Sequence, residues 1–231
     1  MKSNYINVVF VIDESGSMTG TEADVIGGFK KVIDEQKENK DGKCTVSYYK
    51  FNSEVQEVFK GVDVNDVEYL DGKYSPNGMT ALYDGIGVAI DSIGKWLDAM
   101  NEDDKPEKNL IVIMTDGGEN SSREYSSSQV KDMIKHQEDK YSWSFVYMGS
   151  DLDNADDANS LGINTRCFNS KMNYIDNYSI INKAITKYRT TTGTSYQKAC
   201  CLNLSLNEDC EEATTNYANE NNIDVSTLQS N

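Results

Sequence analysis

Basic residues are scarce in this sequence. It has 22 Lys and Arg against 38 Asp and Glu, and its formal net charge is −16. Proteins bind a phosphate backbone or an anionic lipid surface through clustered basic side chains. Long hydrophobic runs are also lacking, and none approaches the roughly 18 apolar residues of a membrane-spanning helix. The composition therefore argues against nucleic acid and against a membrane as partners.

Histidine and paired cysteines are sparse as well. The five cysteines are an odd number at scattered positions, unlike the even sets of secreted disulfide frameworks. A thiolate metal site at Cys200, Cys201 and Cys210 has no obvious fourth ligand, because the only histidine, His136, lies far away in the sequence. The first residues show no signal-peptide cleavage site. We therefore expect a cytoplasmic location, or association with a virion if a phage encodes the protein.

Strand patterns and helical patterns alternate along most of the chain. The apolar runs at 5–12 and 110–114 are continuous, which is typical of strands buried on both faces of a parallel sheet. The predicted strands cover residues 5–12, 44–51, 55–59, 110–114, 143–148 and 165–168. The predicted helices cover residues 21–39, 80–100, 128–141, 155–161 and 174–188. This order predicts an α/β fold with a doubly wound, Rossmann-like, mostly parallel six-stranded sheet, one antiparallel edge strand, and helices on both faces.

The pattern stops after residue 192. Residues 193–231 contain six acidic residues and one basic residue, Lys198, and are poor in apolar side chains. Such a composition favours a flexible or loosely docked segment. The prediction is a folded domain at 1–192 and an acidic tail at 193–231. As an alternative for part of the tail, Leu202, Leu204 and Leu206 alternate as they would in a short strand.

Oxygen-bearing side chains follow two predicted strands and precede one predicted helix. Asp13, Ser15 and Ser17 come after the first strand, Thr80 opens the helix at 80–100, and Asp116 follows the strand at 110–114. The carboxyl ends of parallel strands share one edge of the sheet, and ligands bind there. Carboxylates and hydroxyls are hard ligands that suit Mg²⁺, Mn²⁺ or Ca²⁺. The sequence therefore predicts a metal site at this edge.

Each of these residue types also has an ordinary structural use. Ser, Thr and Asp after a strand or before a helix often act only as turn formers or helix caps. Glu14 and Glu119 lie in the same segments, either close to the metal or as solvated acids at the rim. Three such segments in the expected order favour the metal site over independent caps.

Together these motifs resemble the metal-ion-dependent adhesion site of the von Willebrand factor type A domain. The resemblance covers roughly residues 4–191 and extends to stand-alone bacterial and phage proteins of that family. It implies that Ser15, Ser17 and Thr80 coordinate the ion directly, and that Asp13 and Asp116 bind it directly or through water. It also implies an open coordination position that a partner's carboxylate fills. The Met18–Thr21 segment lacks the extra acids of a second, neighbouring metal site.

The favoured interpretation is a protein-binding module without enzymatic activity, in which Mg²⁺ is the expected cation and Mn²⁺ or Ca²⁺ are alternatives. Because the chain is strongly acidic, we expect a partner surface that is basic overall and carries one Glu or Asp at its centre. Two alternatives stay open. One is an Mg²⁺- or Mn²⁺-dependent hydrolase, of phosphatase or nuclease type, that uses Asp13 and Asp116. The other is a virion or scaffold protein with a vestigial metal site.

Overall fold

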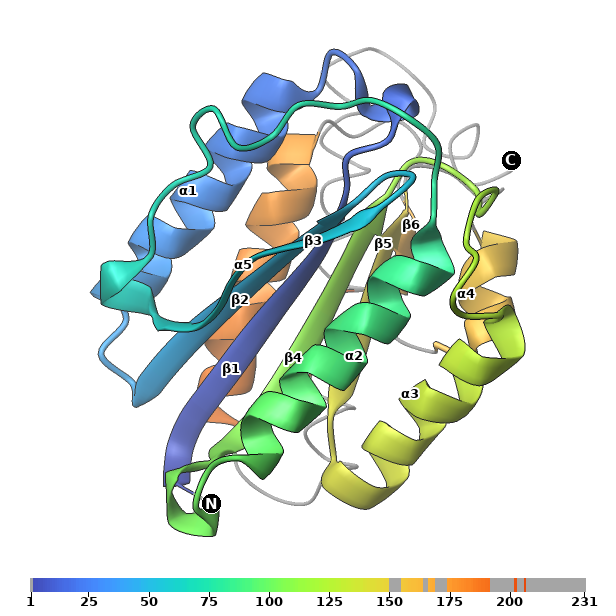
Figure 1. Ribbon diagram of the computed structural model, residues 1–231. Coiled ribbons are helices and arrows are strands. Elements are labelled where there is room, and N and C mark those ends of the chain that lie inside the picture. Colours follow the sequence, from blue (N-terminus) through green and yellow to red (C-terminus); the bar gives the residue numbers. More distant parts are fainter. Residues whose placement is uncertain are drawn as a thin grey trace, which may run out of the picture.

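The computed structural model describes residues 2–149, 155–163, 166–168 and 174–191, together with Leu202 and Leu206. It contains a six-stranded sheet with the order β3-β2-β1-β4-β5-β6 (Figure 1). The strands are β1 (Lys2–Asp13), β2 (Lys43–Phe51), β3 (Val55–Asp63), β4 (Pro106–Thr115), β5 (Ser144–Gly149) and β6 (Arg166–Phe168). All neighbouring pairs are parallel except β2 and β3, which are antiparallel. The predicted mostly parallel sheet with one antiparallel edge strand is confirmed.

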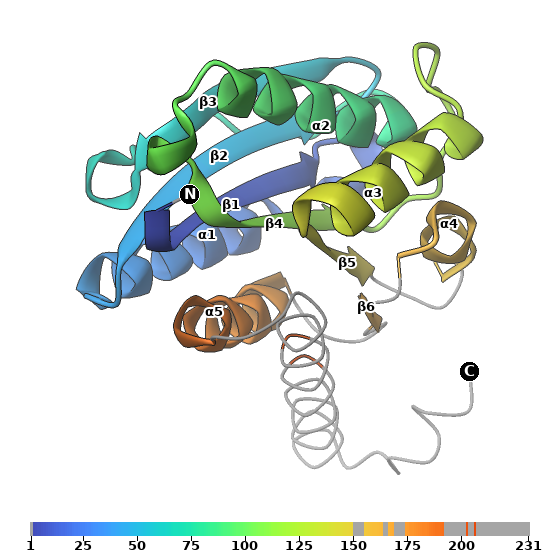
Figure 2. The same ribbon diagram turned by 90° about the horizontal axis from the view of Figure 1, so that it is seen from below.

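Helices cover both faces of the sheet, as Figure 2 shows. They are α1 (Glu22–Glu38) and α5 (Tyr174–Thr190) on one face, and α2 (Leu82–Asp98), α3 (Ser127–Tyr141) and α4 (Ala155–Leu161) on the other. Successive residues of a strand point to opposite faces. Accordingly, Phe10 belongs to the core cluster under α1 and α5, and its neighbours Val9 and Val11 belong to the cluster under α2 and α3. This double burial explains the continuous apolar run of β1.

The chain reverses its direction of winding between β1 and β4. From β1 it passes through α1 to β2 on one side, and from β4 it passes through α3 to β5 on the other. In a doubly wound sheet, this switch point leaves a crevice at the carboxyl ends of the two strands. The crevice lies where Asp13 ends β1 and Thr115 ends β4.

Several element boundaries differ from the predicted ones. The strand predicted at 110–114 begins at Pro106, because Lys108 and Asn109 are buried polar residues that a search for apolar runs leaves out. The helix predicted at 80–100 begins at Leu82, so Thr80 precedes the helix instead of opening it. Among the helices of the described residues, none is long and apolar enough to cross a membrane.

Two residues of the predicted tail contribute to the core. Leu202 and Leu206 are both helical and buried, and they belong to the cluster under α1 and α5. Their spacing of four residues places them on one face of a helix, so the strand alternative is wrong for these two positions. The rest of the tail, including Cys200, Cys201 and Cys210, lies outside the described residues. The domain boundary at residue 192 stays a prediction.

Replacing one of these leucines tests whether the tail stabilises the domain. We expect Leu206→Ala to lower the free energy of unfolding by about 2 kcal/mol, near the lower end of the range for buried leucines. Urea unfolding followed by circular dichroism measures this change. An unchanged urea midpoint would show that the domain is complete without this part of the tail.

Candidate metal-binding site

The three predicted segments meet at the crevice between β1 and β4, and backbone hydrogen bonds join them. The amide of Gly16 donates to the carbonyl oxygen of Gly78 over 3.1 Å, so the turn after β1 contacts the segment before α2. The amide of Asn120 donates to the carbonyl oxygen of Thr80 over 3.0 Å, which attaches the loop after β4 to the same segment. The predicted convergence of these segments is therefore present in the structure.

Asp13 is fully buried at the end of β1, and both of its carboxylate oxygens accept hydrogen bonds. Oδ1 accepts from the amide of Ser15 and Oδ2 from the hydroxyl of Thr115, each over 2.6 Å. The pKa of Asp13 is raised to about 6, chiefly because burial disfavours its charged form. The hydrogen bonds from Thr115 and Ser15 lower the pKa, and the nearby charge of Asp116 adds slightly to its rise. The carboxylate is thus fixed in direction and desolvated.

A short chain of hydrogen bonds links the two serines to Asp116. The hydroxyl oxygens of Ser15 and Ser17 are 2.9 Å apart, and the Ser17 hydroxyl donates to Oδ1 of Asp116 over 2.7 Å. Thr80 is held beside this chain, because its amide donates to the side-chain oxygen of Asn120 over 2.9 Å.

Gly117 makes the close approach of these hydroxyls to the loop after β4 feasible. A Cβ atom at this position would lie 3.0 Å from Oγ1 of Thr80 and 3.3 Å from Oγ of Ser17. Both hydroxyls therefore face the same side of the loop that carries Asp116. A side chain at position 117 would crowd them.

The donor set fits a hard divalent cation. Within the described residues, no group of three or more His, Cys, Asp or Glu side chains is arranged to hold a metal ion. An ion in the crevice would therefore depend on hydroxyl oxygens as well as carboxylates, which suits Mg²⁺, Mn²⁺ or Ca²⁺ and not a soft metal. The hydroxyls of Ser15 and Ser17 have lone pairs that an ion can use.

Glu14 is not a solvated acid at the rim. It is buried, and its Oε1 forms an ion pair with Nζ of Lys50 over 2.8 Å and accepts from the amide of Ser75. The solvated alternative is therefore wrong for Glu14. This carboxylate instead ties β2 and the segment before α2 to the end of β1.

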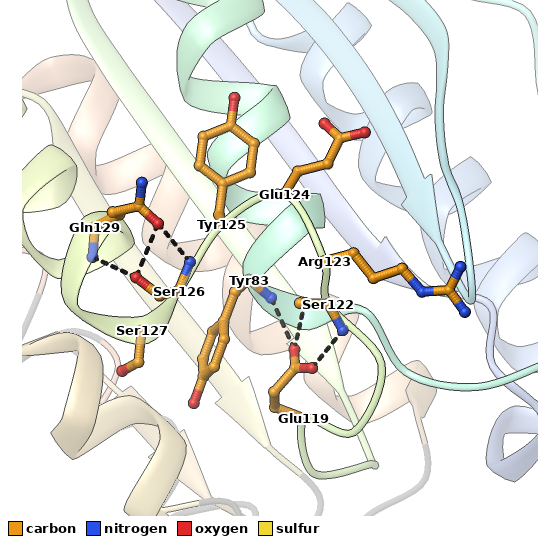
Figure 3. A pocket seen from close by; sticks show the side chains of 9 residues that line it. All are labelled: Tyr83, Glu119, Ser122, Arg123, Glu124, Tyr125, Ser126, Ser127 and Gln129. Atoms are coloured by element: carbon orange, nitrogen blue, oxygen red, sulfur yellow. Dashed lines mark hydrogen bonds between the residues drawn. The ribbon is translucent and has the colours of Figure 1, made fainter.

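Glu119 anchors the loop that follows Asp116. Its side chain accepts from the amide of Tyr83 in the first turn of α2 over 3.0 Å and from the amide of Ser122 (Figure 3). It also accepts from the amide of Ser121. These bonds occupy both carboxylate oxygens, so Glu119 acts as a loop anchor and not as a solvated rim acid.

Asp84 was not predicted to take part in the site. It lies in the first turn of α2 and accepts from three consecutive amides, those of Arg123, Glu124 and Tyr125, over 2.8–2.9 Å. An acid in the first turn of a helix is the only sequence signal for such a role, and it is usually read as a favourable charge at the helix N-terminus. Asp84 fixes the far half of the loop.

A pocket of about 430 Å³ lies beside this loop, between Tyr83 and the first turn of α3 (Figure 3). At its edge, Ser126 caps α3 in a reciprocal pair of hydrogen bonds with Gln129. The exposed side chain of Arg123 extends from the opposite side of the loop. The loop after Asp116 is therefore anchored by hydrogen bonds from Glu119 to Ser126.

Comparison with protein families gives a match over most of the chain. The profile of the von Willebrand factor type A domain matches residues 7–187. No curated protein matches the sequence significantly.

Solved structures with the same fold are distant in sequence. The PilB minor pilin from Streptococcus sanguinis is 14% identical with a TM-score of 0.54, and the match covers 79% of this chain and 61% of the pilin. Proximal thread matrix protein 1 from the mussel byssus, with a zinc-occupied MIDAS motif, is 16% identical with a TM-score of 0.53, covering 87% and 47%. Manganese-loaded TRAP protein from Plasmodium vivax is 16% identical with a TM-score of 0.52, covering 78% and 73%. The chain thus spans less than two thirds of the first two proteins.

Proposed function

The chain belongs to the von Willebrand factor type A domain family, and on this basis we propose that it is a protein-binding module that depends on a divalent cation. The proposed ligands are Asp13, Ser15, Ser17, Thr80 and Asp116. The observation that supports this proposal most directly is the chain of hydrogen bonds from Ser15 through Ser17 to Asp116, beside the Thr80 hydroxyl. A zinc-occupied motif in the byssus protein and manganese in the TRAP protein support a divalent ion.

The three hydroxyl ligands and Asp13 have different proposed roles. The hydroxyls of Ser15, Ser17 and Thr80 would hold the ion directly, and as neutral ligands they would leave it a net positive charge. Asp13 already accepts one hydrogen bond on each carboxylate oxygen, which favours contact through water. When bound, the cation supplies an electrophilic coordination position that attracts an incoming carboxylate. The residues of this chain would hold the ion at the edge of the sheet, where a partner can reach it.

The proposed partner is a protein with a Glu or Asp at the centre of a basic surface. Long-range repulsion from a chain with a net charge of −16 would slow the approach of an acidic partner. A basic surface around one acid avoids this repulsion, and its attraction weakens with salt because the Debye length is only ~10 Å at 0.1 M. We further propose Mg²⁺ as the usual ion, a cytoplasmic or virion location, and no enzymatic activity.

Calorimetric titration with Mg²⁺ and Mn²⁺ tests the metal site. We expect Thr80→Ala to weaken binding at least about tenfold, because it removes a direct ligand while two hydrogen bonds with Asn120 keep the backbone in place. Thr19→Ala is the matched control, since Thr19 lies on the same rim and its hydroxyl donates only to the carbonyl oxygen of Gly16. Equal affinities for wild type and Thr80→Ala would contradict the ligand assignment.

Affinity capture tests the protein-binding function. The immobilised protein is loaded with Mn²⁺, exposed to an extract of the source cells, and eluted with EDTA. A partner should appear in the eluate of the wild type and be missing from that of Thr80→Ala. A protein retained equally by both columns, and not released by EDTA, would show that binding uses another face. Turnover of phosphoester substrates with Mg²⁺ or Mn²⁺ would favour the hydrolase alternative instead.

A further inference from the structure

Met79 is exposed immediately beside the proposed metal site. Among the described residues, Met79 and Tyr141 are the most exposed large hydrophobic side chains, each with 52% of its surface accessible. Met79 directly precedes the proposed ligand Thr80. Tyr141 ends α3, at the opposite end of the sheet (Figure 1). Single exposed hydrophobic residues are common on protein surfaces. Met79 differs from such residues because it lies directly beside a proposed metal ligand.

The backbone around Met79 is firmly held. Its amide donates to the hydroxyl of Ser53 in the β2–β3 turn over 3.0 Å. The preceding carbonyl, that of Gly78, accepts from Gly16 over 3.1 Å, and the amide of Ala81 donates to the carbonyl oxygen of Asn52 over 2.8 Å. The exposure of Met79 is therefore a property of a fixed loop, and the side chain extends from the rim while its backbone stays bonded to two neighbouring segments.

The hydrogen bonds of this segment are made by its backbone and do not require a methionine. Met79 belongs to neither of the two core clusters, so folding gains little from its apolar side chain. Methionine is flexible and polarizable, and it adapts to partners of different shape. Its burial by a partner would remove apolar surface from water, which favours binding.

We infer that Met79 is the apolar half of a two-part contact with the partner. In this contact, which rests on the proposed function, a partner carboxylate binds the cation and a large apolar side chain adjacent to that acid packs on Met79. The recognised element is then a loop or chain end in which Glu or Asp neighbours Leu, Ile, Phe or Met. An acid in a purely polar context would bind less tightly. Met79 thus determines which carboxylates are accepted.

A displayed library of random peptides tests this inference while the partner is still unidentified. Peptides are selected on the immobilised protein with Mn²⁺ and recovered by EDTA. We expect the recovered peptides to contain an acid with a large apolar residue within two positions. For a synthetic peptide chosen from them, Met79→Ser should weaken binding about tenfold, as expected for one lost apolar contact, and Met79→Leu should retain it. Tyr141→Ser is the matched control and should bind as the wild type does.

The outcomes separate the contact from the function on which it rests. EDTA-released peptides whose acid lacks an apolar neighbour, or whose affinity is unchanged by Met79→Ser, would overturn the contact alone. A selection that returns no EDTA-released peptide would overturn the proposed carboxylate-binding function and this contact with it. If Tyr141→Ser weakened peptide binding as much as Met79→Ser does, the contact would also be overturned, because the effect would not be specific to the rim.

Discussion

Asp13→Asn should make the metal-free protein more stable at pH 7 and at the same time abolish its stabilisation by Mg²⁺ or Mn²⁺. The asparagine can keep the local hydrogen bonds. Its oxygen can accept from the amide of Ser15, and its NH₂ group can donate to Oγ1 of Thr115. The proton of Thr115 then has another acceptor, the carbonyl oxygen of Gly117 at 3.0 Å. The substitution therefore removes the charge with little change in packing.

The gain in stability follows from the raised pKa of Asp13. Burial raises this pKa from 3.8 to about 6, so the native state binds a proton more tightly than the unfolded chain does. The contribution of Asp13 to the free energy of unfolding therefore falls as the pH rises from about 4 to about 6, by about 3 kcal/mol in total. At pH 7 the metal-free wild type carries this full penalty and the asparagine variant does not. Below about pH 4 the two should be equally stable.

A bound cation offsets most of this difference in the wild type. At a hundredfold excess over the dissociation constant, a ligand that binds only the native state stabilises it by about 2.7 kcal/mol. Because protons compete for Asp13, the affinity of the wild type for Mg²⁺ should fall by about tenfold per pH unit below pH 6. Thermal unfolding with EDTA and with Mg²⁺, at pH 5 and pH 7, measures both effects. Asp103→Asn, at an exposed acid, is the matched control, and an equal metal shift in Asp13→Asn would refute the assignment.

The fold and the convergence of the site segments could be predicted because they depend on two strong signals. Continuous apolar runs mark strands buried on both faces, and in a parallel sheet the carboxyl ends of such strands meet at one edge. The positions of Asp13 and Asp116 follow from this rule, since each comes at or directly after the end of a central strand. Thr80 lies beside Gly117 of the loop after β4 even though its helix begins two residues later.

The supporting residues could not be predicted, because their partners are distant in sequence. Asp84 is separated by about forty residues from the three amides that it binds. Glu14 has the polar character of a solvated acid and becomes buried only through Lys50 and Ser75. Hydrophobic periodicity assigns such residues to the surface, because it depends only on the polarity of each side chain. It contains no information on the distant hydrogen-bond and ion-pair partners that allow a polar side chain to be buried. Buried polar residues are therefore where sequence-based prediction failed most often in this chain.

Lys108 is a buried polar residue with a large expected effect on stability. It lies near the start of β4 with 2% of its surface exposed. Its Nζ donates to the carbonyl oxygens of Tyr188, Arg189 and Thr191 over 2.7–2.8 Å. The last carbonyls of a helix have no partner within the helix and carry a partial negative charge. The three donors of one lysine thus satisfy the end of α5 and join it to the central strand.

Lys108→Ala should lower the free energy of unfolding by about 3–5 kcal/mol, because it removes three hydrogen bonds from a buried, charged donor at the end of α5 and opens a cavity beneath the helix. Urea unfolding measures the loss, and Lys95→Ala, at an exposed lysine on α2, should change stability by less than about 0.5 kcal/mol.

The stretch of β4 between Lys108 and Thr115 separates this contact from the metal site by roughly 23 Å along the strand. The folded variant should therefore bind Mg²⁺ with wild-type affinity. A loss of metal binding in the folded variant would mean that the position of α5 controls the site; an unchanged urea midpoint would mean that the end of α5 finds its hydrogen-bond partners elsewhere.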